Sequence, residues 1–246
     1  MSVKKFSQSL YHSVFQFVKS FFQILVDFIY PPVCIQCNQR LDHRGFICES
    51  CKNKFLNAMK PHFQMGKDDF YHLQGDIFFN EVITFWDYTP DMEQLIFQIK
   101  YQRKKKLGLL LGQILGKTLQ TVPFCGEDCV IVPVPLHNVR RRERGYNQSE
   151  ILCKGMADYI AAPIQCDCLI RCRHTLTQTK LTAHERQENV KDAFEVSKPC
   201  NVKGKTIMLV DDVITTGATI NNCALSLKRA GAEAIVGIAL ARPRLE

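Results

Sequence analysis

Apolar residues follow two patterns along the chain. Four short runs have the length of strands, and three of them are apolar throughout, which is typical of strands buried on both faces of a sheet. They lie at residues 81–88, 130–134, 206–210 and 234–241. Between them, apolar residues recur every three or four positions, as in amphipathic helices that begin near Pro90, Lys105, Ser149 and Thr219. Strands that alternate with helices predict an α/β fold with a parallel sheet flanked by helices.

The stretch MLVDDVITTGATI, residues 208–220, joins one of the buried runs to the helix that follows it. It therefore lies at the carboxyl end of a strand, where open α/β sheets bind ligands. Backbone N–H groups at the helix start favour an anion such as phosphate, and Gly217 lets the backbone approach a ligand closely. Asp211 and Asp212 can accept hydrogen bonds from sugar hydroxyls or lie near a hydrated divalent cation. A ribose 5-phosphate would match both features, with its phosphate at the helix start and its hydroxyls at the acidic pair. The alternative is a capped helix start with a solvated acidic pair.

The segment VDDVITTGAT resembles the motif with which type I phosphoribosyltransferases bind phosphoribosyl diphosphate (PRPP). In that family the two acids bind the ribose hydroxyls, and the loop that follows wraps the 5-phosphate. The resemblance implies that Asp211 and Asp212 are the catalytic acids and that Mg²⁺ binds together with PRPP. The PRPP-binding residues that it implies are Val210, Asp211, Asp212, Thr215, Thr216, Gly217, Ala218 and Thr219.

The composition is that of an ordinary globular protein, with 46% hydrophobic and 23% charged residues among 246, which excludes a disordered chain. The formal net charge is +8. Basic residues cluster at positions 103–106 and 140–144. Such an excess favours polyanionic partners, including nucleic acid and pyrophosphate-bearing substrates, and a solvated basic surface is the alternative.

The first thirty residues contain the apolar segment Val14–Tyr30. Lys19 and Asp27 interrupt this segment, and the apolar stretch between them is too short to span a bilayer. We therefore expect an amphipathic helix within residues 1–30, ended by prolines, that packs on its own domain or on a partner. A cytoplasmic protein without a transmembrane span follows from this interpretation, and attachment to the inner face of the membrane is the alternative.

Four of the twelve cysteines form two C-x-x-C pairs that are ten residues apart. They are Cys34, Cys37, Cys48 and Cys51. Two such pairs can close a tetrahedral site around one structural Zn²⁺, because the protein supplies all four ligands. We therefore expect a small zinc module over residues 31–60, with disulfides or free thiols as the alternative. The other eight cysteines are interpreted as buried or idle thiols.

The buried run at residues 130–134 begins a second strand–loop–helix unit, whose loop can face the first one. In phosphoribosyltransferases the corresponding loop holds the pyrophosphate. The resemblance implies a pyrophosphate loop that includes Pro135, Leu136, Arg140 and Arg144. Arginine donors suit phosphate oxygens, and a basic surface turn is the alternative.

The polar segment at residues 173–196 lies between two expected core strands and is a candidate mobile lid. Its candidate site residues are Thr175, Gln178, Arg186 and Asn189. An exposed hairpin or helix that merely connects the two strands is the alternative.

Five features follow one another in a fixed order. They are the cysteine module, VPVPL with RRRERGYNQSE, T-x-x-Q-x-x-L, R-x-x-NV-x-x-AF, and the PRPP-like motif. This combination is similar to the ComF family of bacterial competence proteins, over about residues 20–243. The resemblance implies a type I phosphoribosyltransferase-like domain over residues 75–246 and a role in the uptake and handling of single-stranded DNA, with DNA-uptake helicase-type proteins as partners. Phosphoribosyl transfer to an acceptor is one interpretation of this resemblance, and a non-catalytic nucleic-acid-binding or scaffold protein that retains the fold is the alternative.

Overall fold

The computed structural model describes most of the chain after the first thirty residues. The described residues are 31–42, 45–64, 75–120, 128–172, 193–197 and 200–243, together with 15, 18, 26, 28–30, 69, 70, 73 and 122. The candidate lid residues Thr175, Gln178, Arg186 and Asn189 lie outside the described residues, as does most of the expected N-terminal helix. The chain divides into two compact units, residues 1–57 and 58–246. Among the described helices, none is long and apolar enough to cross a membrane.

The first unit contains both cysteine pairs. The chain folds back on itself after the first pair, with a single antiparallel bridge between Val33 and Arg40. Inside this turn the amide of Asn38 donates to the carbonyl of Cys34 at 2.9 Å. The second pair lies at the start of helix α2 (Glu49–Asn57). A tight turn and a helix start thus present the four thiols.

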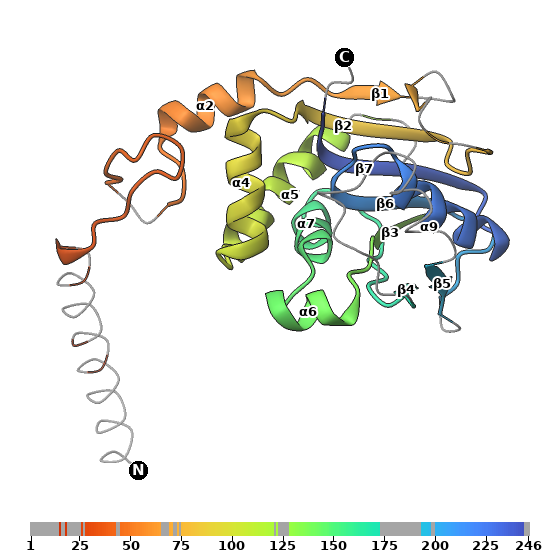
Figure 1. The fold of residues 1–246 in the computed structure, drawn as a ribbon. Coiled ribbons are helices and arrows are strands. Elements are labelled where there is room, and N and C mark those ends of the chain that lie inside the picture. Colours follow the sequence, from red (N-terminus) through yellow and green to blue (C-terminus); the bar gives the residue numbers. More distant parts are fainter. Residues whose placement is uncertain are drawn as a thin grey trace, which may run out of the picture. The chain divides into compact units, whose positions relative to one another are not determined.

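The second unit is built on a five-stranded sheet in the order β1-β2-β7-β6-β3 (Figure 1). The strands are β1 (His62–Gln64), β2 (Glu81–Asp87), β3 (Cys129–Pro133), β6 (Thr206–Val213) and β7 (Ala234–Arg242). All are parallel except β1, which pairs antiparallel with β2 at the edge. The predicted parallel sheet is therefore confirmed. Its parallel register brings the carboxyl ends of β3, β6 and β7 to one edge.

Helices cover both faces of this sheet. They are α4 (Pro90–Tyr101), α5 (Lys105–Leu119), α7 (Gln148–Met156) and α9 (Ala218–Arg229), in addition to the short α6 (Asn138–Arg144). On one face α9 shares an apolar cluster with buried strand residues such as Val132, Leu209 and Ile235. The other face is covered by α5 and α7 (Figure 1). This is the α/β architecture that the alternating runs predict.

Helices α5 and α7 touch through their backbones. A Cβ added at Gly112 would lie 2.3 Å from the carbonyl oxygen of Leu152, and one at Gly155 would lie 2.3 Å from that of Leu109. Both distances are too short for any side chain. The two glycines therefore allow an approach that places α7, and the residues at its start, against β6.

A two-stranded antiparallel ribbon, β4 (Leu169–Arg171) with β5 (Phe194–Val196), stands apart from the main sheet. Cys168 and Cys200 flank this ribbon and form a disulfide. The interpretation of these two cysteines as unpaired thiols is therefore wrong. They are 32 residues apart in sequence, and only the pairing of β4 with β5 brings them together.

Candidate functional site

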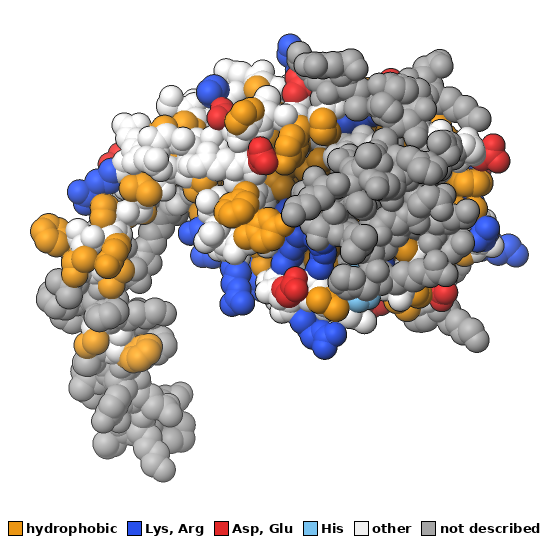
Figure 2. Space-filling view, in the orientation of Figure 1, with side chains coloured by type: hydrophobic (Ala, Val, Ile, Leu, Met, Phe, Trp, Pro, Cys, Tyr) orange, Lys and Arg blue, Asp and Glu red, His pale blue; other side chains and the backbone are white. Residues whose placement is uncertain are grey.

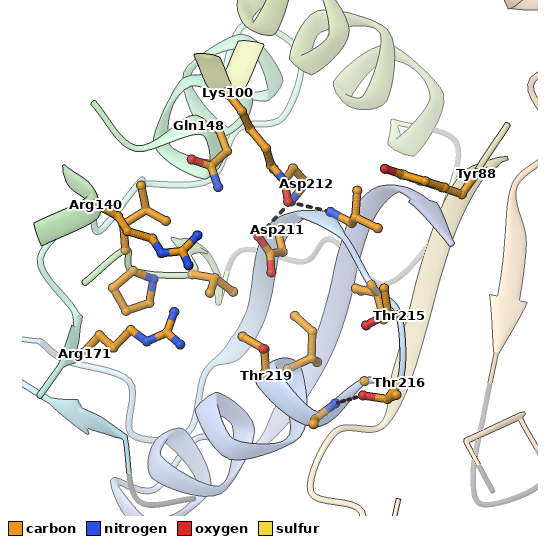
Figure 3. Close-up of a pocket in the computed structure, with 18 of the residues that line it drawn as sticks. Tyr88, Lys100, Arg140, Gln148, Arg171, Asp211, Asp212, Thr215, Thr216 and Thr219 are labelled. Carbon is orange, nitrogen blue, oxygen red and sulfur yellow. Dashed lines mark hydrogen bonds and ion pairs between the residues drawn. The ribbon is translucent and has the colours of Figure 1, made fainter. Parts of the chain in front are cut away.

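A pocket of about 300 Å³ lies at the carboxyl ends of β3 and β6 (Figure 3). Both ligand loops expected from the sequence contribute to it. The predicted residues that line it are Pro135, Leu136, Arg140, Arg144, Asp211, Asp212, Thr215, Thr216, Gly217, Ala218 and Thr219. Val210 does not line it, because this residue is fully buried within β6 between its neighbours on β3 and β7.

The acidic pair lies in strand β6, although the sequence predicts that it opens the loop. The strand continues because β7 pairs with it as far as Val213, which is opposite Ala241. The loop is short and ends at Gly217, which has a φ of 81° and is the N-cap of α9. Thr216 accepts a hydrogen bond from the amide of Ala218 through its Oγ1, at 3.4 Å. A tight, hydroxyl-rich turn thus leads into the amino end of a twelve-residue helix, which favours an anion.

Phe70, from the polar stretch before β2, packs against Gly217 in this turn. Phe70 is fully buried, and a Cβ added at Gly217 would lie 2.7 Å from its ring. The guanidinium of Arg242 lies 4.1 Å from the centre of the same ring and donates to the carbonyl of Asp69. Gly217 is therefore required both by its backbone conformation and by this close approach.

The two acids differ in their surroundings. Asp211 is partly buried and accepts hydrogen bonds at its Oδ1 from Ser149 Oγ at 3.2 Å and from the amide of Asp212 at 2.8 Å. Burial and the adjacent Asp212 carboxylate raise the pKa of Asp211 to about 7. Asp212 is buried and forms an ion pair with Lys100, with 2.7 Å between Nζ and Oδ2. One acid is thus balanced by a cation, and the other titrates near neutrality.

The arginine-rich segment expected to be a loop folds partly into the helix α6. The side chain of His137 caps its start by accepting from the amide of Val139, and Gly145 ends it with a φ of 76°. Arg144 on its last turn donates to Gln148 Oε1 at 2.9 Å. Arg140 and Arg144 both line the pocket. The two arginines expected in a pyrophosphate loop therefore lie at the pocket, but on a helix.

Some residues that line the pocket are not predicted as site residues from the sequence. They are Tyr88, Lys100, Tyr101, Gln148 and Arg171. Arg171, on β4, lies across the pocket from the acids, and its guanidinium points toward the same space as that of Arg140 (Figure 3). Burial lowers the pKa of Arg171, and the nearby charge of Arg140 acts in the same direction. Two arginines from separate elements therefore converge on the space in front of Asp211, where an anion would relieve their repulsion.

Comparison with known proteins places this geometry in a family. A model of the phosphoribosyl transferase domain matches residues 147–244. The chain is 32% identical over 209 residues to DNA utilization protein YhgH of Salmonella typhimurium, which covers 82% of this chain and 87% of that protein. It is 28% identical to Competence protein F of Haemophilus influenzae, over 85% of this chain and 96% of that protein. The chain belongs to the ComF family. A further relative, Competence protein ComFC of Bacillus subtilis, is 23% identical over 83% of this chain and 81% of its own length.

The ComF likeness covers more of the chain than the phosphoribosyl transferase domain model does. That model begins at Asn147 and so contains the acidic pair, the hydroxyl-rich turn and Arg171, but neither α4 nor α6. Lys100 and Arg140 therefore come from the part of the ComF chain that precedes the matched domain. The pocket combines residues of the common domain with residues from outside it.

The cysteine module of this ComF-family chain has the geometry of a metal site. The sulfur atoms of Cys34, Cys37, Cys48 and Cys51 all lie within 4.8 Å of one another, and those of Cys37 and Cys48 are 3.7 Å apart. Tetrahedral zinc with Zn–S bonds of about 2.3 Å separates its sulfurs by about 3.8 Å. Burial opposes ionisation of Cys34, but the backbone amides of Cys37 and Cys48 favour the thiolate and bring its pKa to about 6. These four residues could therefore hold Zn²⁺.

Proposed function

We propose that this ComF-family protein binds PRPP with Mg²⁺ in the pocket and acts in natural competence, in the uptake and handling of single-stranded DNA. One observation carries the proposal: an acidic pair, a hydroxyl-rich turn at a helix start and two converging arginines line a single pocket of about 300 Å³. The role in competence is supported by relatives named Competence protein F, Competence protein ComFC and DNA utilization protein YhgH.

The turn before α9 holds the 5-phosphate of PRPP. The hydroxyls of Thr215 and Thr216 in this turn, the hydroxyl of Thr219 in the first turn of α9 and the amides at the helix start are donors for phosphate oxygens. Asp211 and Asp212 carry only acceptors when ionised, and the hydroxyls of the ribose are donors that match them. Carboxylate oxygens also suit a hydrated Mg²⁺, which neutralises charge on the pyrophosphate when it is bound.

The arginines hold the pyrophosphate. Arg140 and Arg171 lie on the opposite side of the pocket from the turn (Figure 3), and Arg144 also lines the pocket. Guanidinium groups bind phosphate oxygens with paired donors. When an acceptor attacks C1 of the ribose, the bond from C1 to the pyrophosphate oxygen breaks and its electron pair leaves with the pyrophosphate. Arginines already placed around that group stabilise the departing charge. The candidate lid would exclude water during this step.

A second function, binding of nucleic acid without catalysis, is favoured by the formal charge of +8 and by the exposed basic turn at residues 103–106. Its signature is affinity that falls steeply with salt, because phosphate contacts release counterions. In either function the protein works in the cytoplasm, with DNA-uptake helicase-type proteins as partners.

Calorimetric titration of the zinc-loaded protein with PRPP and Mg²⁺ tests the proposal. The wild type is expected to bind, and an Asp211→Asn/Asp212→Asn variant to bind at least about tenfold more weakly, since it loses charge and acceptors at two positions. Arg229→Gln, an exposed change at the far end of α9, is the matched control and binds as the wild type does. A folded wild type that releases no heat between pH 6 and 8 overturns the PRPP site.

A further inference from the structure

A second hollow, of about 420 Å³, lies beside the proposed PRPP pocket. Its lining is basic and aromatic and includes Lys100, Tyr101, Arg103, Arg140, Glu143 and Arg144. Lys100, Tyr101, Arg140 and Arg144 also line the first pocket, so the two hollows share a wall. The proposed PRPP site uses Arg140 and Arg144 of that wall for the pyrophosphate but leaves the rest of the second hollow without a role.

Two aromatic side chains stand exposed near this hollow: Tyr101, which lines it, and Phe97, which packs against Tyr101. Phe97 and Tyr101 are one turn apart at the end of α4, are 47% and 56% exposed, and have ring centres 5.0 Å apart. The guanidinium of Arg144 lies 5.1 Å from the centre of the Tyr101 ring. Large exposed aromatic rings beside an arginine are not needed to hold α4 in place, because Leu95, Ile96 and Ile99 form its buried face. They offer flat surfaces on which bases can stack.

Cations surround this pair. The α4–α5 turn, taken together with the first two residues of α5, carries four exposed basic residues in succession, Arg103, Lys104, Lys105 and Lys106. The facing helix α6 adds Arg140, Arg142 and Arg144. Figure 2 shows Lys and Arg side chains gathered beside hydrophobic ones in the region of α4 and α6. Like charges this dense repel one another, and a chain of phosphates is the ligand that neutralises several of them at once.

We propose that this surface, formed by the end of α4, the α4–α5 turn and α6, binds single-stranded DNA, with bases stacked on Phe97 and Tyr101 and phosphates along the basic turn. The inference rests on the proposed function, which it deepens by giving the strand a binding site. Duplex DNA does not fit, because its bases are already stacked on one another. Since the strand shares Arg140 and Arg144 with the pyrophosphate, PRPP and the strand weaken each other's binding by the same factor.

Fluorescence anisotropy with the full zinc-loaded chain and a labelled 15-nucleotide oligothymidylate tests this proposal. Phe97→Ala is expected to weaken binding about tenfold, which lies within the range measured for loss of one stacked base. Arg103→Gln/Lys106→Gln is expected to weaken binding and to flatten the dependence of log K on log salt by about 1.4, or about 0.7 for each phosphate contact. Saturating PRPP with Mg²⁺ is expected to lower the affinity of the wild type for the strand.

The controls match these changes elsewhere on the second unit. Tyr159→Ala removes an aromatic ring that is 38% exposed, and Lys117→Gln/Arg229→Gln removes two exposed charges; both variants should bind DNA as the wild type does. Phe97, Arg103 and Lys106 do not line the PRPP pocket, so their variants keep wild-type PRPP affinity. Wild-type DNA binding by Phe97→Ala, equal affinity for a duplex, or no effect of PRPP would each overturn the proposal. Any of these results with PRPP binding intact leaves the PRPP site standing.

Discussion

Lys100 Nζ lies 2.7 Å from Asp212 Oδ2 and so joins the last turn of α4 to the end of β6. The two side chains are only 22% and 9% exposed, so both charges of this ion pair are largely withdrawn from water. Removing one partner from such a pair leaves the other charge buried without compensation. The pair therefore ties a helix outside the common domain to the acid that we propose for ribose binding.

Lys100→Met tests how much this ion pair contributes to the free energy of unfolding. We expect the free energy of unfolding to fall by about 1–3 kcal/mol, because Asp212 keeps its charge and loses its cation. Adding Asp212→Asn in the same chain should restore most of the loss, since no charge is then left unbalanced. Urea unfolding of the wild type, both single variants and the double variant gives the coupling energy. A coupling near zero would show that the contact contributes nothing to stability.

Asp211 predicts a pH dependence of stability with a definite sign. Its pKa is raised from 3.8 to about 7 in the folded chain, so between these values the folded chain holds a proton that the unfolded chain has lost. The free energy of unfolding therefore falls as pH rises from about 4 to 7. Asp211→Asn should remove this fall and be more stable than the wild type at pH 8 by roughly 1–3 kcal/mol.

Melting temperatures at pH 5, 6, 7 and 8 measure this effect. Asp128→Asn changes a carboxylate that is 83% exposed and is expected to follow the wild-type profile. A wild type and an Asp211→Asn variant with parallel profiles over this range would contradict the raised pKa.

Gly112→Ala and Gly108→Ala separate a backbone clash from a side-chain clash on the same helix. The new Cβ at position 112 meets the carbonyl oxygen of Leu152 at 2.3 Å, whereas at position 108 it meets a side-chain methyl, Cγ2 of Ile151, at 2.9 Å. A side chain can turn aside, and alanine gains about 1 kcal/mol of helix propensity over glycine. We expect Gly112→Ala to lose about 2–4 kcal/mol of stability and Gly108→Ala to change it by less than about 1 kcal/mol, as measured by urea unfolding.

The cysteine module predicts about one Zn²⁺ for each chain, measured by elemental analysis of protein purified without added metal. Cys34→Ser/Cys48→Ser should lose the metal, because a tetrahedral site cannot close on two thiolates. Cys129→Ser/Cys153→Ser, which changes two buried cysteines outside the module, should keep it. Full zinc content in the first variant would place the metal elsewhere.

The strands and the loop chemistry could be predicted because their signals are local. A run such as residues 206–210 is apolar from Ile207 to Val210, and the acids and threonines that follow it lie within six residues. The end of β6 could not be predicted, since its extension to Val213 depends on pairing with β7. The helix within the arginine-rich segment depends on a cap from His137 and a left-handed Gly145, which a charged stretch without apolar periodicity does not reveal.

Lys100, Arg171 and Phe70 could not be predicted for a different reason. Each belongs to a segment whose own pattern points elsewhere: Lys100 to the end of a helix, Arg171 to a three-residue strand and Phe70 to a polar stretch. Their positions around the acidic pair and the phosphate turn arise from packing between elements distant in sequence. The residue pattern of a single segment therefore cannot show that these side chains come together.

The Cys168–Cys200 disulfide makes the intervening sequence a closed covalent ring. Residues 169–199 contain Arg171, the four candidate lid residues and β5. A protease that cuts once within this ring produces two fragments that stay linked, so the nicked protein runs as one band on a gel without reductant and as two bands with it. The ring therefore lets the lid sequence be cut while Cys168 and Cys200 still hold the two resulting fragments together.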